Sequence, residues 1–330
     1  MSSYAFAAGF SVHPEIVVVY PDGFHESSVN KVSAKDLSFR LGGTSANLAH
    51  AMKSLGHEGL LLVASGVNPT DMRTYLLERL LADSGLRYSM LPVREETSVS
   101  MIPINGIRNH VVTSKRPLLA EAVPAIAEQV RATRSEIGWK WRIVTSCLPT
   151  EILLAEALLG ENKGNRILNP RAELMEDKDT THRLLQRTDI LVCNEHEFLT
   201  YFDATREEIQ GSQFAAIHNL GVTMIAVTRD SRGSLISWHG DVFEFPAPQL
   251  VPFVHEVGAG DWWLGGFLSS LIDQQVYTVF DLKQQAIEWA GVSASVTAAL
   301  KVGQYGGGSG PSKVAVQTTL AVIAATTRAG

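Results

Sequence analysis

The stretch DILVCNEHEFLTYFDA, residues 189–204, joins a short apolar run to a segment whose apolar residues return with the period of a helix. We expect a buried strand at 189–194 and a helix at 196–204. Similar apolar, β-branched runs predict further buried strands at 4–10, 58–66, 141–149, 165–170 and 224–230. Helical spacing predicts further helices at 45–56, 71–85 and 151–164. Such alternation indicates an α/β fold with a mostly parallel central sheet that is covered by helices on both faces.

Two regions break this alternation. Residues 15–41 and 86–113 contain short β-like segments joined by turn sequences such as PDG and NG. We expect them to form a small antiparallel sheet over one edge of the main domain. The length of 330 residues is compatible with one large domain or two ordinary ones.

The composition excludes several classes of protein. With 28 basic and 34 acidic residues, the net charge of -6 gives no electrostatic footprint for nucleic acid. Cys147 and Cys193 both lie in predicted strands, which argues against a disulfide framework or a cysteine-based zinc site. The first residues lack the basic start of a signal peptide, and no apolar run is long enough to cross a membrane. We therefore expect a cytoplasmic protein with neither a nucleic-acid nor a membrane partner.

The stretch HEVGAGDWWLGGFLSSL, residues 255–271, carries the most suggestive chemistry. Gly258, Ala259 and Gly260 leave successive backbone amides uncovered at the positive end of a helix that begins near Asp261, an arrangement that suits a phosphoryl group. A carboxylate at this place can also accept a proton from an attacking hydroxyl. Together these features indicate phosphoryl transfer. The alternative is an ordinary glycine-rich turn in which Asp261 caps the helix.

A second glycine-led helix start favours the catalytic interpretation. GGTSANLAHAMKSLG, residues 42–56, begins with Gly42 and Gly43 and contains the amide side chain of Asn47. Two such starts, far apart in one α/β chain, are able to supply the acceptor site and the phosphate site of one cleft.

These two motifs resemble the signatures of the ribokinase-like (PfkB) family of carbohydrate kinases, and the resemblance extends over nearly the whole chain. The N-terminal signature is met by Gly42, Gly43, Asn47, Ala49 and Gly56, and the C-terminal one by Gly258, Ala259, Gly260, Asp261, Gly265, Gly266 and Phe267. The resemblance implies a ribokinase-like three-layer α/β/α domain spanning residues 1–330. The segments at about 15–41 and 86–113 would then be its small antiparallel β lid.

The resemblance also implies a function. A family member would be an ATP-dependent kinase acting on a hydroxyl of a sugar or sugar-like molecule. Asp261 would be the general base, the amides of residues 258–260 the anion hole, and Gly42, Gly43 and Asn47 part of the acceptor site. A homodimer formed through the lid is also implied, because an open β layer would otherwise leave exposed edges.

Two more segments resemble the nucleotide site of this family. DILVCNEHE places Asn194 and Glu197 where relatives contact the nucleotide phosphates and the hydration shell of Mg²⁺, so ATP and Mg²⁺ are the implied cosubstrate and cofactor. VTRDSRGS places Thr228 and Gly233 along the nucleotide. Without the resemblance, Asn194 is more simply a helix cap and Glu197 a solvated acid at a helix start.

The sequence departs from the family pattern around the motif at 258–261. His255, Glu256 and Val257 precede it where most relatives have Asp-Thr, and these positions help to build a monovalent-cation site in several relatives. Activation by potassium is therefore not predicted. Trp262 replaces a small residue and is more simply a bulky core substitution than a binding residue.

Two further departures concern the acceptor site, which stays unassigned, and the nucleotide loop. Pro14 stands at the spacing of an acceptor-binding aspartate in relatives, and Glu15 follows it as a potential substitute. Asp230 replaces the first glycine of the nucleotide loop. Sugar, sugar phosphate, sugar acid and nucleoside acceptors all remain open. The alternative function is a catalytically impaired family member that binds a sugar or a nucleotide.

Overall fold

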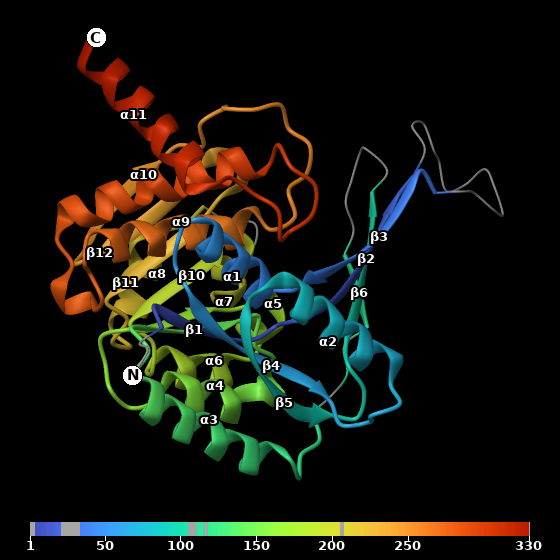
Figure 1. Cartoon of the computed structure of the whole chain (residues 1–330). Helices are drawn as coiled ribbons and strands as arrows, with labels where there is room; N and C mark the ends of the chain where they lie inside the picture. The colour runs from blue at the N-terminus through green and yellow to red at the C-terminus, as the bar shows by residue number, and fades with distance from the viewer. Residues whose placement is uncertain are drawn as a thin grey trace.

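The computed structural model describes residues 4–20, 34–104, 111–114, 116, 118–204 and 208–329. Within these residues, the six predicted buried strands all occur and belong to one nine-stranded sheet, in the order β13-β12-β11-β10-β9-β8-β1-β4-β5 (Figure 1). Its strands are β1 (Phe6–Phe10), β4 (Gly59–Gly66), β5 (Arg87–Arg94), β8 (Trp141–Thr145), β9 (Arg166–Asn169), β10 (Ile190–Asn194), β11 (Met224–Thr228), β12 (Ser234–Trp238) and β13 (Asp241–Phe245). From β11 to β5 every pairing is parallel, and only β12 and β13 add antiparallel pairings at one edge.

Helices cover both faces of this sheet. They are α1 (Thr44–Ser54), α2 (Met72–Ser84), α3 (Val123–Ile137), α4 (Ile152–Leu159), α5 (Ala172–Glu176), α6 (Lys178–Leu185), α7 (Glu195–Tyr201), α8 (Gly211–His218), α9 (Ala259–Asp273), α10 (Gln284–Lys301) and α11 (Lys313–Ala329). The predicted α/β fold class is confirmed.

The continuous apolar strands are explained by two cores, one on each face. Successive residues of a strand point to opposite faces, so Ile190 and Val192 join a core with α1, α2, α9 and α10, whereas Leu191 and Cys193 join a core with α3, α4 and α6–α8. A strand buried on both faces therefore favours apolar residues at most positions. The buried arginines of β8 and β9 are exceptions, and each is hydrogen-bonded, Arg142 to Asn165 and Arg166 to Asp189.

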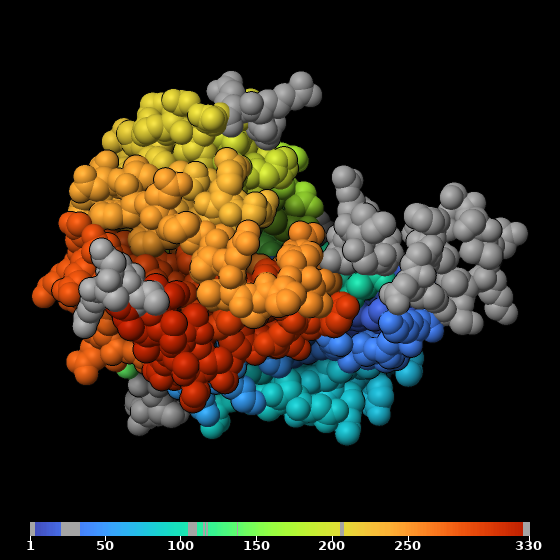
Figure 2. Space-filling model, turned by 90° about the horizontal axis from the view of Figure 1, so that it is seen from above, coloured from blue at the N-terminus to red at the C-terminus, as the bar shows by residue number. Residues whose placement is uncertain are grey.

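The small sheet contains β3 (Asp36–Gly42), β2 (His13–Val19), β6 (Val99–Ile104) and β7 (Val112–Ser114), in that order. It projects to one side of the main body (Figures 1 and 2). β2 pairs with β3 and β6 with β7 in antiparallel fashion, while the pairing of β2 with β6 is parallel. The predicted PDG and NG turns lie outside the described residues.

The predicted lid segment 86–113 requires a correction at its start. β5 lies at its beginning but pairs in parallel with β4 at the edge of the large sheet. Leu91 and Val93 are buried there against the core that contains α3, which favours the large sheet for this strand. Only the part from Val99 onward belongs to the small sheet.

Several predicted elements end earlier than expected, and local backbone explains two of them. The predicted helix 151–164 is α4, which stops before Gly160, a residue with φ of 69°. The predicted strand 141–149 is β8, which stops before Ser146, where φ is 47°. α2 agrees closely with its prediction, with Asp71 as the N-cap and Gly85 as a left-handed C-cap.

Close helix packing fixes the position of α9. A Cβ on Gly265 would lie 2.6 Å from Cβ of Ala51 in α1, and a Cβ on Gly266 would lie 2.5 Å from Oγ1 of Thr297 in α10. The glycine pair therefore lets α9 approach both neighbours, and α1 and α9 are held side by side. Among the described residues, no helix is both long and apolar enough to cross a membrane.

Candidate active site

The starts of α1 and α9 meet at one place. Gly43 is the N-cap of α1 with φ of 93°, and Gly258 is the N-cap of α9 with φ of 86°, a backbone conformation that favours glycine. Asn47, buried in the first turn of α1, donates a hydrogen bond from Nδ2 to Oδ2 of Asp261 at 2.7 Å. Residues 214 positions apart thus form one polar centre.

The backbone at the start of α9 supplies unpaired amides, although not all of the predicted ones. The amide of Ala259 donates to the carbonyl of Glu256 at 2.9 Å. Among the described residues, the amides of Gly258, Gly260 and Asp261 have no acceptor. A Cβ placed on Gly260 would meet no atom within 4 Å, so space is open next to these amides. We call the amides of Gly258, Gly260 and Asp261 the phosphoryl cradle.

The electrostatics of Asp261 suit a base that works near neutral pH. Burial raises the pKa of its carboxyl to about 7, and the negative charges of Glu15 and Glu197 contribute to the rise. The hydrogen bond from Asn47 and the positive charge of Lys301 act in the opposite direction on this pKa. The carboxylates of Glu15 and Glu197 therefore both lie within electrostatic range of Asp261.

Glu15 lies beside the start of α1. It is buried in β2, and its Oε1 accepts a hydrogen bond from the amide of Gly43 at 3.3 Å. A Cβ on Gly42 would overlap the Glu15 side chain, so glycine at 42 makes room for it. Burial raises the pKa of Glu15, whereas the positive charge of Arg40 lowers it. Gly42, Gly43, Asn47 and Glu15 are thus neighbours.

The residues predicted for nucleotide binding lie at the carboxyl ends of two adjacent strands. Asn194 ends β10 and pairs in register with Thr228 at the end of β11. Asn194 and Glu197 cap α7 reciprocally: Oδ1 of Asn194 accepts from the amide of Glu197 at 2.8 Å, and Oε2 of Glu197 accepts from the amide of Asn194 at 2.9 Å. Burial raises the pKa of Glu197 to about 7.

The loop after β11 depends on Gly233. Its φ is 86°, and a Cβ there would lie 2.0 Å from the carbonyl oxygen of Phe245 at the end of β13. Asp230 also adopts a positive φ, 50°. Aspartate tolerates the left-handed region better than most residues, which explains how it stands where relatives have glycine.

Two of the residues around the motif at 258–261 that differ from the family pattern, His255 and Trp262, are buried. His255 has no exposed surface, and burial lowers the pKa of its imidazole to about 4. Trp262 is buried, as predicted for a core substitution. Its Nε1 also donates to the carbonyl of Gly307 at 2.7 Å. Trp262 therefore holds the glycine-rich loop after α10 against the start of α9, where Gly307 also packs on Gly258 and Asn47.

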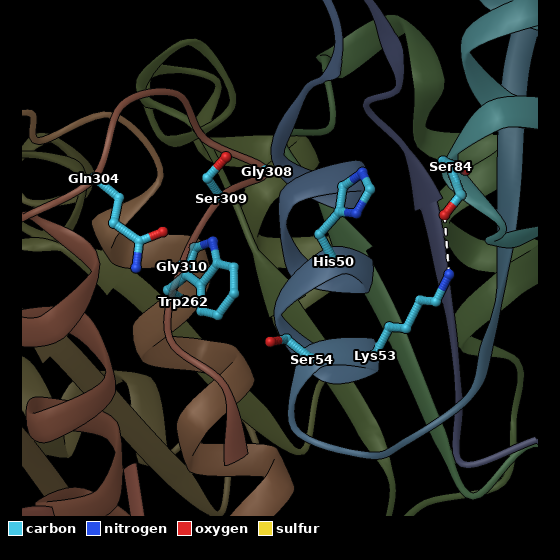
Figure 3. Close-up of a pocket in the computed structure, with 9 residues that line it drawn as sticks. All are labelled: His50, Lys53, Ser54, Ser84, Trp262, Gln304, Gly308, Ser309 and Gly310. Atoms are coloured by element: carbon cyan, nitrogen blue, oxygen red, sulfur yellow. Dashed lines mark hydrogen bonds between the residues drawn. The ribbon is translucent and has the colours of Figure 1, made fainter. Parts of the chain in front are cut away.

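A cavity of about 440 Å³ adjoins the site without including Asp261 (Figure 3). It lies between α1 and the loop after α10, and its lining residues are His50, Lys53, Ser54, Ser84, Trp262, Gln304, Gly308, Ser309 and Gly310. Lys53 donates there to the backbone carbonyl of Ser84 at 2.9 Å. Trp262, which follows Asp261 in the chain, is the lining residue next to the polar centre in sequence.

Comparison with known proteins decides the family. The model of the pfkB family carbohydrate kinases matches residues 15–314. The chain belongs to the pfkB family. No curated protein matches it. The predicted resemblance is thereby confirmed, and it covers both motifs as well as the strands that carry the candidate nucleotide residues.

Solved structures agree on the fold of this pfkB-family protein. Ribokinase from Thermotoga maritima is 19% identical, with a TM-score of 0.72 over 96% of this chain and 99% of its own. Phosphofructokinase-2 from Escherichia coli in complex with potassium is 14% identical, with a TM-score of 0.74 over 98% and 100%. A nucleoside kinase from Methanocaldococcus jannaschii is 18% identical, with a TM-score of 0.69 over 97% and 99%. At these identities the likeness concerns the fold.

Two side chains near the site carried no signal in the sequence. Nζ of Lys301 donates to the carbonyl of Gln304 at 3.1 Å, and Nη1 of Arg40 donates to the carbonyl of Tyr305 at 3.0 Å. A lysine that ends a helix is ordinary. An arginine on a short strand is equally unremarkable, so only the three-dimensional contacts single them out.

Proposed function

We propose that this pfkB-family protein transfers the γ-phosphoryl group of ATP to a hydroxyl of a sugar or sugar-like molecule. The observation that carries the proposal is the hydrogen bond of 2.7 Å between Asn47 and Asp261 beside the phosphoryl cradle. It joins a carboxylate, an orienting amide and unpaired backbone donors in one place. This is the set that a phosphoryl transfer requires.

In the proposed reaction, Asp261 takes the proton of the acceptor hydroxyl. The acceptor oxygen then bonds to the γ-phosphorus, and the bond from that phosphorus to the bridging oxygen breaks, with its electron pair leaving on ADP. The phosphoryl cradle donates hydrogen bonds to the transferring oxygens, whose negative charge spreads in the transition state. Asn47 fixes the orientation of the Asp261 carboxylate throughout.

The nucleotide and acceptor sites follow from the neighbouring residues. We assign Asn194, Thr228 and Gly233 to the nucleotide, and Gly42, Gly43 and Asn47 to the acceptor. Glu15 would replace the usual aspartate by accepting hydrogen bonds from acceptor hydroxyls.

The residues fit a magnesium ion that is held mainly by the nucleotide. Among the described residues, no group of three or more His, Cys, Asp or Glu is placed to hold a metal alone. Mg²⁺ commonly uses one or two carboxylates, waters and substrate phosphates. Glu197 provides a half-buried carboxylate just after the carboxyl end of β10. Mg²⁺ would neutralise phosphate charge when bound. The predicted cytoplasmic location stays a prediction.

A screen for phosphoryl acceptors tests the proposal. Purified protein with MgATP is offered sugars, sugar phosphates, sugar acids and nucleosides, and the products are read by mass spectrometry. A phosphorylated product with at least one acceptor class is expected. The alternative, a catalytically impaired binding protein, is motivated by the altered residues Pro14 and His255. It would give thermal shifts with a ligand of the panel but no product.

We also propose a homodimer through the small sheet. One face of this sheet carries exposed apolar side chains that are neighbours in register, with exposed fractions of 54% for Leu37, 51% for Phe39, 41% for Met101 and 56% for Val112. A contiguous apolar patch of this kind commonly marks an interface. A second copy of the chain is the partner that we assign to it.

A further inference from the structure

Lys301, the last residue of α10, is a lysine with no exposed surface. Its ammonium donates one hydrogen bond, to the carbonyl of Gln304, and no ion pair of Lys301 occurs within the described part of the chain. Burying a charge without a close counter-charge is costly. The mechanism above makes no use of the Lys301 ammonium, so a role for this buried charge has to be sought elsewhere.

The surroundings of Lys301 connect it to the phosphoryl cradle. The next residue, Val302, accepts hydrogen bonds from the amides of Val254 and His255 at 2.8 and 2.9 Å, so α10 ends directly against the segment that leads to Gly258. The loop that Lys301 contacts through Gln304 continues to Gly307. A Cβ placed on Gly258 would approach Cα of Gly307 to 2.7 Å.

Each of the three carboxylates at the site has a cation that opposes the rise of its pKa caused by burial. Arg40 lowers the pKa of Glu15, Arg171 lowers that of Glu197, and Lys301 lowers that of Asp261. Three carboxylates on three elements thus each have one cation within electrostatic range. Lys301 is the cation on the side of the cradle.

We propose that Lys301 is a positioning residue that acts as a fixed positive charge behind the phosphoryl cradle, stabilising the transferring group through space. The inference rests on the proposed function, because a phosphoryl group must occupy the cradle for the charge to act on it. Lys301 itself does not touch the substrate. Its charge acts across the backbone of residues 302–307 and 254–257, which links the end of α10 to Gly258 of the cradle.

The protonation of the neighbouring groups supports this role. Burial lowers the pKa of Lys301 to about 8, and the charge of Asp261 opposes that shift. His255, with its pKa lowered to about 4, is neutral at pH 7 and adds no charge. The cations facing this region at neutral pH are therefore Lys301 and Arg40, from α10 and β3.

A binding experiment with a transition-state mimic tests the role without knowledge of the acceptor. Isothermal titration measures the affinity for MgADP alone and for MgADP with aluminium fluoride, which imitates the transferring phosphoryl group. Lys301→Met removes the charge at similar volume. Lys301→Gln removes the charge but keeps a donor for the carbonyl of Gln304. Lys178→Met is the matched control, because Lys178 also donates to backbone carbonyls but lies at the start of α6.

Wild type is expected to bind MgADP more tightly with aluminium fluoride than without it. Both Lys301 variants should retain the affinity for MgADP alone and lose about tenfold or more of the fluoride-dependent gain. Their thermal midpoints should equal or exceed that of wild type, since a buried charge has been removed. Lys178→Met should behave like wild type in both titrations.

Three results would overturn the inference. The first is a Lys301→Gln variant that matches wild type, which would reduce Lys301 to a hydrogen-bond donor for the loop. The second is an equal loss of both affinities. The third is failure of both Lys301 variants to fold, which would make Lys301 a residue of stability. If wild type itself shows no fluoride-dependent gain, it is the proposed function that fails, which is a separate outcome.

Discussion

At the scale of single residues, the dominant effect at the site is the cost of burying a carboxylate. Asp261 is half-buried and lies in the field of Glu15 and Glu197, and burial together with these charges raises its pKa to about 7. A base with this pKa is matched to work near neutral pH. The same environment that would suit Asp261 to the proposed proton transfer also destabilises its charged form.

The hydrogen bond from Asn47 predicts a shift in the pH profile. It favours the ionised form of Asp261, so Asn47→Ala should raise the pKa of this carboxyl further. Because the base must be deprotonated, kcat/KM of wild type should rise with pH through about 7, below the pH range above about 8 in which Lys301 loses its charge. The rise should come at a higher pH in the variant. A profile of Asn47→Ala that coincides with that of wild type would contradict this role of Asn47.

Asp261 also predicts a conflict between activity and stability. Its folded pKa of about 7 exceeds the ordinary 3.8, so the wild-type protein loses stability as the pH rises from about 4 to 7. Asp261→Asn cannot ionise and escapes this loss. Its thermal midpoint should exceed that of wild type at pH 8 and approach it near pH 4. A lower midpoint for the variant at pH 8 would be incompatible with this explanation.

At the scale of elements, the glycine pair of α9 decides how the two helix starts meet. Gly265→Ala would place a Cβ 2.6 Å from that of Ala51, so α1 and α9 must move apart. We expect a loss of about 1–3 kcal/mol in the free energy of unfolding, measured by urea denaturation. Gly211→Ala is the control, because a Cβ there meets nothing within 4 Å. Equal losses in the two variants would show that close packing of α9 is not the cause.

The elements also show what sequence patterns are able to predict. Strand β10 was predictable because burial on both faces demands an apolar run from Ile190 to Cys193. The sheet to which β5 belongs was not predictable from the sequence. Its pairing with β4, for example Leu61 with Tyr88, joins residues far apart in the chain and leaves no periodic pattern in either strand. The early end of α4 was missed because Gly160 was not recognised as its C-cap.

At the scale of the whole molecule, the exposed face of the small sheet predicts self-association. Phe39→Glu places a charge within the proposed interface and should convert a dimer into a monomer in light scattering coupled to gel filtration. Phe280→Glu is the matched control, since Phe280 is also exposed, at 72%, but lies in the turn before α10. A wild-type monomer, or a dimer that persists in Phe39→Glu, would refute this interface.

The candidate site is likewise a property of the whole chain. The motifs at 42–47 and 258–261 indicated the family from the sequence, because together they resemble its two signatures. The sequence predicted that the two motifs share one cleft. It did not predict the hydrogen bond between Asn47 and Asp261. The sequence could not show that the amide of Ala259 is already hydrogen-bonded while the amides of Gly258 and Gly260 are free. That bond, to the carbonyl of Glu256, depends on the conformation of the turn. Lys301 was not singled out in the sequence analysis, because only its complete burial in the folded protein distinguishes it from other lysines.

The most direct measurement is product formation from MgATP and the acceptor panel by wild type and Asp261→Asn, side by side, with MgATP affinity measured for both. The account predicts a phosphorylated product with wild type, and with the variant a turnover lower by about 10²–10⁴-fold at unchanged MgATP affinity. Equal turnover by the two proteins would contradict the assignment of Asp261 as the base. The absence of product with every acceptor class would contradict the kinase itself.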